Sequence, residues 1–222
     1  MIRSLIRWAG WTLFILSASA LALFSLRYLS ADPLVAPPEL RANAKRNMPW
    51  FTVHATGAAV ALLMLPLQLL LAGKKRQRVL HRIIGRIYVA GVMIGAGAGL
   101  LLAPFSFGGS VAGLGFASLA LAWLFCTWAG VLAARAGDRT AHRIWMIRST
   151  ALTLSALTLR LYLPLPELFG MTYRDGYMLI AWACWVPNLV LANILLGRHA
   201  HRLAAAEQFV PAEAASPQVS CS

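Results

Sequence analysis

The chain has 222 residues, of which 59% are hydrophobic and only 12% are charged, and its formal net charge is +13. Soluble globular domains carry about 25% charged residues, so this composition excludes a disordered chain, a disulfide scaffold and an ordinary soluble enzyme. A membrane-spanning helix needs roughly 20 apolar residues, and the length accommodates six of them with short connections. We therefore expect an all-α polytopic membrane bundle.

Six apolar segments follow one another along the chain: Trp8–Leu26, Phe51–Ala72, Ile84–Pro104, Ala112–Ala134, Ile144–Leu163 and Tyr177–Gly197. Each can cross a hydrocarbon core of about 30 Å as a helix, which satisfies its own backbone polar groups in lipid. The first segment follows Arg3 and Arg7, but its apolar run exceeds the roughly 7–15 residues of a signal peptide. We expect it to stay attached as an anchor helix.

These segments predict a single six-helix transmembrane domain over residues 1–203, with residues 51–165 as a core of two helical hairpins. The segment 27–50 is rich in proline and is expected to be an external, turn-rich connection. Residues 204–222 mix Ala, Pro, Ser, Gln and Glu, so we expect a disordered C-terminal tail.

Lys and Arg are distributed unevenly between the connections on the two sides of this bundle. With a cytoplasmic N-terminus, fourteen of the 20 Lys and Arg residues lie on the cytoplasmic side. Cytoplasmic loops are enriched in these residues, so both termini are predicted to be cytoplasmic. Anionic lipid headgroups attract such loops, whereas nucleic-acid binding needs a basic face on a folded domain, which is not expected here.

Small and polar side chains within the segments indicate close helix packing. Gly91, Gly95 and Gly99 follow at four-residue spacing, which lets two backbones approach closely in lipid or at an interface between copies of the chain. Hydroxyls of the fifth segment are expected to bond between helices; they are Ser149, Thr150, Thr153, Ser155 and Thr158. Aromatic residues near segment ends, Tyr88 among them, are predicted to lie at the membrane interface.

A short motif occurs twice at an offset of 61 residues, as Arg78-x-x-His81-Arg82-Ile83 and as Arg139-x-x-His142-Arg143-Ile144. Each copy begins an outward-running helix, so both histidines are expected at one depth on the cytoplasmic side. Two apposed imidazoles are the axial ligands of a six-coordinate b-type haem. The side chains expected to neutralise its propionates are Arg82, Arg86, Arg143 and Arg148. The alternative is that these residues only anchor their helices at the headgroups.

A second polar site is expected toward the outer side. His54 lies within the second apolar segment, and an ionisable group there usually faces the bundle interior. Gln68 falls on roughly the same helix face, and Arg160 of the fifth segment has a comparable depth. The three side chains are expected to bind a quinone head or another anionic group. The alternative is that Arg160 reaches the headgroups and His54 bonds to a backbone carbonyl.

Two other functions stay open beside a haem- or quinone-binding electron-transfer component. A small-molecule transporter would be lined by His54, Gln68, Thr153 and Arg160, although no acidic residue lies in an apolar segment. A membrane scaffold would need the packing ladders alone. The three cysteines are far apart, and no catalytic constellation appears, so no metal other than haem iron is expected.

Several motifs stand in the order of one known family. They are His54-Ala-Thr-Gly57, Pro66-Leu-Gln68, His81-Arg-Ile-Ile-Gly85-Arg86-Ile-Tyr88, Gly108-Gly109, and His142-Arg-Ile-Trp145-Met-Ile-Arg148 through Arg160. Over about residues 51–165 the chain resembles domain-of-unknown-function family 2306, a bacterial family of predicted multi-spanning membrane proteins. Leu69 replaces an aromatic residue that family members often have. The resemblance implies a bacterial inner-membrane protein and supplies no activity.

Overall fold

A computed structural model describes residues 2–208, with side chains from Ser4 to Arg202, and all regular secondary structure there is helical. The α-helices are α1 (Ile2–Ser25), α2 (Arg41–Leu71), α3 (Arg78–Leu102), α4 (Gly109–Arg135), α5 (Arg139–Thr153), α6 (Ser155–Tyr162), α7 (Leu165–Leu168), α8 (Tyr173–Ala183) and α9 (Val186–Gln208). The short 3-10 helices are η1 (Leu26–Ser30), η2 (Pro33–Val35), η3 (Pro38–Leu40), η4 (Lys75–Gln77) and η5 (Ala103–Phe105).

Five helical stretches within the described residues are long and apolar enough to cross a membrane. They are Ser4–Ser30, Pro38–Leu71, Lys75–Phe105, Gly109–Arg135 and Tyr173–Arg202. The segment expected as the fifth of six crossings is instead divided at Leu154 into α5 and α6. The tail expected from residue 204 begins later, because α9 continues to Gln208; residues 209–222 lie outside the described part of the chain.

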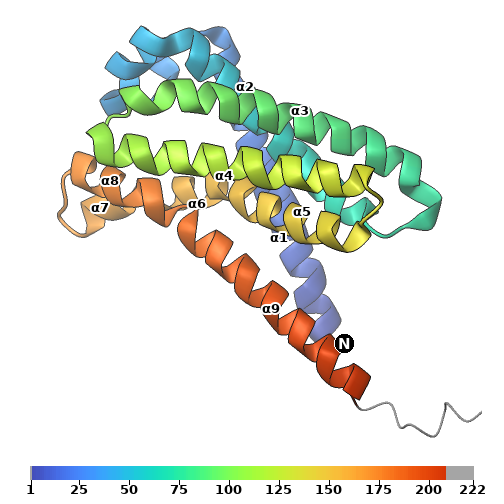
Figure 1. The fold of residues 1–222 in the computed structure, drawn as a ribbon. Coiled ribbons are helices and arrows are strands. Elements are labelled where there is room, and N and C mark those ends of the chain that lie inside the picture. Colours follow the sequence, from blue (N-terminus) through green and yellow to red (C-terminus); the bar gives the residue numbers. More distant parts are fainter. Residues whose placement is uncertain (1, 209–222) are drawn as a thin grey trace, which may run out of the picture.

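Helices α2 to α5 form a four-helix ring (Figure 1). α2 packs on α3, α3 on α4 and α4 on α5, while α5 touches α2, so α3 and α5 are a diagonal pair across the core. We call the end with the α2–α3 and α4–α5 connections, residues 72–77 and 136–138, the basic end. The other end, with residues 26–50, 103–108 and 163–172, is the distal end.

The remaining helices flank this ring. α1 packs mainly on α2, and α8 packs on α4 near the distal end. α9 contacts α5 and then diverges from the ring (Figure 1). The residues predicted as a two-hairpin core, 51–165, contain most of α2 and all of α3–α5, and Ile180, Cys184 and Trp185 from the later part of the chain share the same buried cluster.

The closest helix pair is α2 with α3. A Cβ placed on Gly57 would lie 2.5 Å from the Gly95 nitrogen and 2.9 Å from the Gly91 oxygen. Only glycine leaves room for such an approach of two backbones, and this packing replaces the hydrophobic driving force that lipid removes. The helix-packing interpretation of the glycine ladder is confirmed.

Two helix breaks lie side by side and are joined by polar side chains. α5 ends and α6 begins around Leu154, and α8 and α9 are separated before Pro187. The Thr158 hydroxyl donates to the Cys184 carbonyl at 2.5 Å, and the Asn188 amide donates to the Ala151 carbonyl at 3.3 Å. The predicted bonding of fifth-segment hydroxyls between helices is confirmed, and these bonds satisfy carbonyls that the breaks would leave free.

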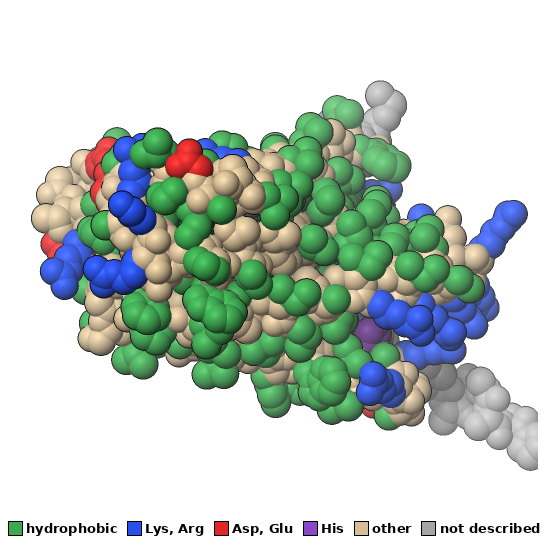
Figure 2. All heavy atoms as spheres, turned by 90° about the horizontal axis from the view of Figure 1, so that it is seen from above, with side chains coloured by type: hydrophobic (Ala, Val, Ile, Leu, Met, Phe, Trp, Pro, Cys, Tyr) green, Lys and Arg blue, Asp and Glu red, His purple; other side chains and the backbone are tan. Residues whose placement is uncertain are grey.

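The surface shows the pattern of a membrane protein. Hydrophobic side chains cover the middle of the face in Figure 2, while charged side chains gather at its two ends. Lys and Arg surround a histidine at one end, and acidic and basic side chains mix at the other. Many large apolar side chains are exposed on the long helices, including Leu114 at 63% and Phe125 at 63%. Such a belt is stable when hydrocarbon covers it.

Candidate functional site

The histidines of the 61-residue repeat both lie at the basic end. His81 lies in the first turn of α3 and His142 in the first turn of α5. The two helices are the diagonal pair of the ring, and His142 adds an electrostatic effect at His81. Both rings therefore lie at the same end of the bundle, and their facing one another stays a prediction.

Hydrogen bonds from α2 and α4 fix the surroundings of this pair. Nδ1 of His142 lies 2.8 Å from the Gly130 carbonyl oxygen of α4, so it carries the proton and donates it. Nε2 of the same ring takes no part in this bond. Nδ1 of His81 is buried and has no hydrogen-bond partner among the described residues. A buried polar atom of this kind points to a group that the protein itself does not supply.

A contact deeper in the core shows how α3 and α5 are aligned along their length. The Tyr88 hydroxyl lies 2.7 Å from the Ser149 hydroxyl, and these residues are again 61 positions apart. His81 and His142 stand seven residues, about two helical turns, before them. The Tyr88–Ser149 pair therefore meets across the diagonal with the two histidines at equal distances before it, which indicates that α3 and α5 run parallel and in register.

Tyr88 belongs to a closed network of buried hydrogen bonds. Thr153 donates to the Ser149 carbonyl at 2.9 Å and lies 2.7 Å from the Tyr88 hydroxyl, while Thr127 lies 2.7 Å from the Ser149 hydroxyl. Since each hydroxyl has one proton, Tyr88 must donate to Thr153, Ser149 to Tyr88, and Thr127 to Ser149. The Trp123 indole also donates to Thr153 at 3.0 Å. Every proton in this network has one acceptor.

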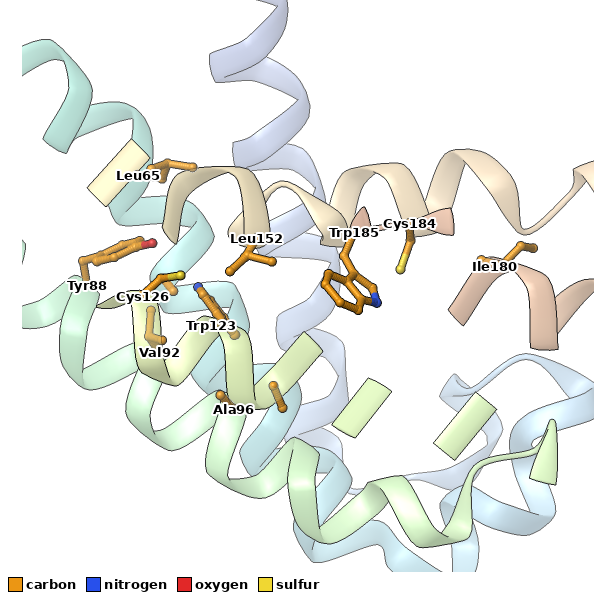
Figure 3. Close-up of a cluster of buried hydrophobic side chains, with 12 residues drawn as sticks. Leu65, Tyr88, Val92, Ala96, Trp123, Cys126, Leu152, Ile180, Cys184 and Trp185 are labelled. Carbon is orange, nitrogen blue, oxygen red and sulfur yellow. The ribbon is translucent and has the colours of Figure 1, made fainter. Parts of the chain in front are cut away.

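The network corrects the sequence prediction for Tyr88. That residue was expected in the interfacial aromatic belt, but it is only 1% exposed and is the largest fully buried side chain. Figure 3 shows Tyr88 and Trp123 reaching from α3 and α4 toward the same part of the core as Leu152. The position of Tyr88 near the end of its apolar segment suggested an interfacial ring. In the structure, hydroxyl groups of the facing helix instead bond to the Tyr88 hydroxyl within the core.

The arginines predicted around the histidine pair fall into two groups. Arg82, Arg86 and Arg143 have exposed side chains at the basic end and form no ion pair with a described residue. Arg148 instead turns toward α9, where its Nε donates to Asn193 at 2.9 Å and its guanidinium lies 4.5 Å from the centre of the Trp145 ring. Arg148 therefore holds α9 against α5.

The second polar site loses one of its three predicted members. His54 bonds through Nδ1 to the Gly95 carbonyl of α3 at 2.8 Å, and Arg160 of α6 acts on it electrostatically. Gln68 does not join them: its Nε2 donates to the His81 carbonyl at 2.8 Å, at the basic end. Fourteen residues separate Gln68 from His54, about 21 Å along a helix, so facing the same way does not bring them together.

The residues proposed to line a transport path also separate. Thr153 is committed to the buried hydroxyl network and Gln68 to the His81 carbonyl, leaving His54 and Arg160 as the pair that meets. Tyr173 and Tyr177 of α8 lie within the electrostatic reach of Arg160 and were not predicted as part of this site. Their signal in the sequence was only an aromatic pair before an apolar segment.

Comparison with protein families identifies the chain. The model of a family described as predicted membrane protein (DUF2306) matches residues 51–196. The chain belongs to this family. No curated protein and no solved structure matches it. The resemblance noted in the sequence is thereby confirmed, and the match extends beyond residue 165 to include α8 and the first part of α9, up to residue 196.

The DUF2306 region contains both candidate sites and the network that links their helices. His54, His81, His142 and Arg160 all lie within residues 51–196, whereas α1 and the segment before residue 51 fall outside the match. Among the described residues, no cluster of three or more His, Cys, Asp or Glu side chains gathers in a way that could hold a metal ion.

Proposed function

We propose that the basic end of the bundle binds a b-type haem through His81 and His142, and that the protein is an electron-transfer component of a bacterial inner membrane. The observation that carries this proposal is the placement of one histidine in the first turn of each of the diagonal helices α3 and α5, which the Tyr88–Ser149 contact holds in register. A haem placed between diagonal helices takes one axial ligand from each.

Two histidine side chains are a suitable set of protein ligands for a cofactor that itself supplies most of the ligands of its metal. A metal ion bound by protein alone needs three or more side chains, and no such cluster occurs in the described part of the chain. A porphyrin supplies four nitrogens, so two histidines complete the coordination. A bound haem supplies one-electron chemistry.

The hydrogen bonds of the two rings also support the proposal. Ligating histidines usually donate their second ring nitrogen to a carbonyl or carboxylate, as His142 does to Gly130. His81 has a buried nitrogen without a partner in the described chain, and its backbone is held by Gln68. The exposed guanidinium groups near both rings match the propionates in charge; they belong to Arg82, Arg86 and Arg143.

The full-length protein, purified from haem-sufficient cells, is expected to show a Soret band that shifts on reduction with dithionite. His81→Ala and His142→Ala should each lose most of the bound haem, because one axial ligand is then missing. His142→Met should retain haem and raise its reduction potential, because a thioether favours the reduced iron. Absorption spectra and a redox titration measure these outcomes.

The matched control is His199→Ala, because His199 is an exposed histidine of α9. This variant should keep the wild-type spectrum. Size-exclusion chromatography of each variant separates loss of haem from loss of fold. Colourless wild-type protein, or equal haem content in His81→Ala and His199→Ala, would contradict the proposal.

The second polar site favours quinone binding as a partner activity. His54 is oriented by the Gly95 carbonyl, so that Nε2 remains for a ligand, and Arg160 adds a positive charge nearby. The Arg160 guanidinium can donate to a quinone carbonyl oxygen, while Nε2 of His54, whose Nδ1 donates to Gly95, can accept the hydroxyl proton of the reduced quinol. The aromatic rings of Tyr173 and Tyr177, 6.0 Å apart and stacked, lie beside this cation.

Titration of a short-chain quinone should quench the tryptophan fluorescence of the purified protein. Arg160→Gln and His54→Gln are each expected to weaken binding about tenfold, since one charge-assisted hydrogen bond contributes roughly 1.5–3 kcal/mol. Arg174→Gln is the control, because Arg174 is an exposed arginine of the neighbouring α8. Equal affinity in Arg160→Gln and Arg174→Gln would exclude a quinone at this site.

A further inference from the structure

A cavity of about 320 Å³ lies at the distal end, away from the histidine pair. It is formed between the start of α2 with η3 on one side and the α3–α4 connection on the other. Its lining residues are Glu39, Ala42, Asn43, Arg46, Pro104, Phe105, Ser106 and Phe107. Ligand sites begin at about 300 Å³, so the cavity suits a small molecule or a headgroup.

The two walls of the cavity are fastened together by Asn43. Its amide nitrogen donates to the Phe105 carbonyl, and its side-chain oxygen accepts from Asn47 at 2.7 Å. The polar groups of Asn43 are thus occupied, so this side chain builds the wall. The Ser106 hydroxyl, in contrast, is buried without a hydrogen-bond partner among the described residues. It is the unused polar group of the cavity.

Two opposite charges line the same cavity without pairing. Glu39 and Arg46 are both exposed, and neither forms an ion pair with a described residue. A carboxylate takes an ammonium group, and a guanidinium takes a phosphate in bidentate fashion. The aromatic ring of Phe105 beside them adds an apolar surface that also attracts a cation. The lining therefore complements a ligand with one positive and one negative group.

The position of the cavity identifies a phosphate as the anionic group. The apolar stretches Pro38–Leu71, Lys75–Phe105 and Gly109–Arg135 all have one end at this cavity, so it opens where a hydrocarbon core gives way to lipid headgroups. We propose that it binds a phosphoethanolamine group, with the phosphate at Arg46 and the primary ammonium at Glu39. The ammonium also donates to Ser106, which a quaternary ammonium cannot do.

Native mass spectrometry of the full chain tests this proposal with three lipids of equal chain length. Phosphatidylethanolamine should remain bound at least tenfold more than phosphatidylcholine, which has no donor, and than phosphatidylglycerol, which has no cation. Glu39→Gln should remove this preference, whereas Arg46→Gln should weaken the retention of all three lipids, because all of them carry the phosphate. The controls are Glu167→Gln and Lys45→Gln, because both carry the same kind of charge on exposed positions outside the lining.

A titration with soluble glycerophosphoethanolamine distinguishes the two sources of the group. Binding of the soluble compound that depends on Glu39 and Arg46 assigns the cavity to a free ligand, and retention of the lipid alone assigns it to the membrane. Both results support the recognition of phosphoethanolamine. The proposal is overturned if phosphatidylglycerol binds as well as phosphatidylethanolamine, or if Glu39→Gln and Glu167→Gln behave alike.

Discussion

Replacing Tyr88 by Ala is expected to destabilise the bundle by about 3–5 kcal/mol, the usual cost of truncating a buried aromatic side chain. Tyr88 is the largest fully buried side chain and spans the core from α3 to α5. Its loss leaves a cavity where Leu152 and Trp123 pack. It also removes the acceptor of the Ser149 proton and one donor to Thr153.

Tyr88→Phe separates the two contributions, because it keeps the ring and removes the hydroxyl. Hydrogen bonds within membrane bundles contribute about 0.6 kcal/mol on average and at most about 1.7 kcal/mol, so this variant should lose roughly 1–2 kcal/mol. Titration with SDS, followed by circular dichroism, measures both losses. Phe169→Ala is the control, since that ring is 76% exposed. A Tyr88→Ala variant as stable as Phe169→Ala would show that the network does not hold the diagonal together.

Much of the fold follows from the sequence because lipid imposes a simple rule on apolar segments. Four of the six predicted segments match uninterrupted candidate spans, and Tyr177–Gly197 falls within the stretch Tyr173–Arg202. Ile144–Leu163 differs because its hydroxyls bond to other helices in the core. A hydropathy profile depends only on the residues of one segment and contains no information about hydrogen-bond partners on another helix. The break at Leu154 therefore lay beyond this kind of prediction.

The candidate site was predictable where a repeat carried the information. The 61-residue offset made His81 and His142 equivalent, and the structure places each of them in the first turn of its helix at the basic end. The same offset relates Tyr88 to Ser149, a signal that was present but unused. Gln68 was placed at the wrong end because helical periodicity fixes the face of a residue, whereas depth depends on the number of turns. Applying the 61-residue offset to Tyr88 and counting helical turns would together have predicted the buried hydrogen-bond network.

Gly57→Ala is expected to destabilise the contact of α2 with α3 by about 3 kcal/mol, the upper part of the range for overpacking. The added Cβ would lie 2.5 Å from the Gly95 nitrogen and 2.8 Å from its Cα. Both atoms belong to the backbone, so no side-chain rotation relieves the clash, and the helices have to move apart. The His54 hydrogen bond to the Gly95 carbonyl should weaken with them.

Gly97→Ala provides the matched control for this effect. Gly97 lies in the same small-residue run of α3, yet nothing stands within 4 Å of a Cβ placed there. Because alanine is the better helix former by about 1 kcal/mol, this variant should be as stable as the wild type or more stable. Thermal unfolding followed by size-exclusion chromatography compares the two. Equal gains in both variants would mean that helix propensity rather than close packing governs these positions, whereas a loss confined to Gly57→Ala assigns the stability of the ring to the contact between two backbones.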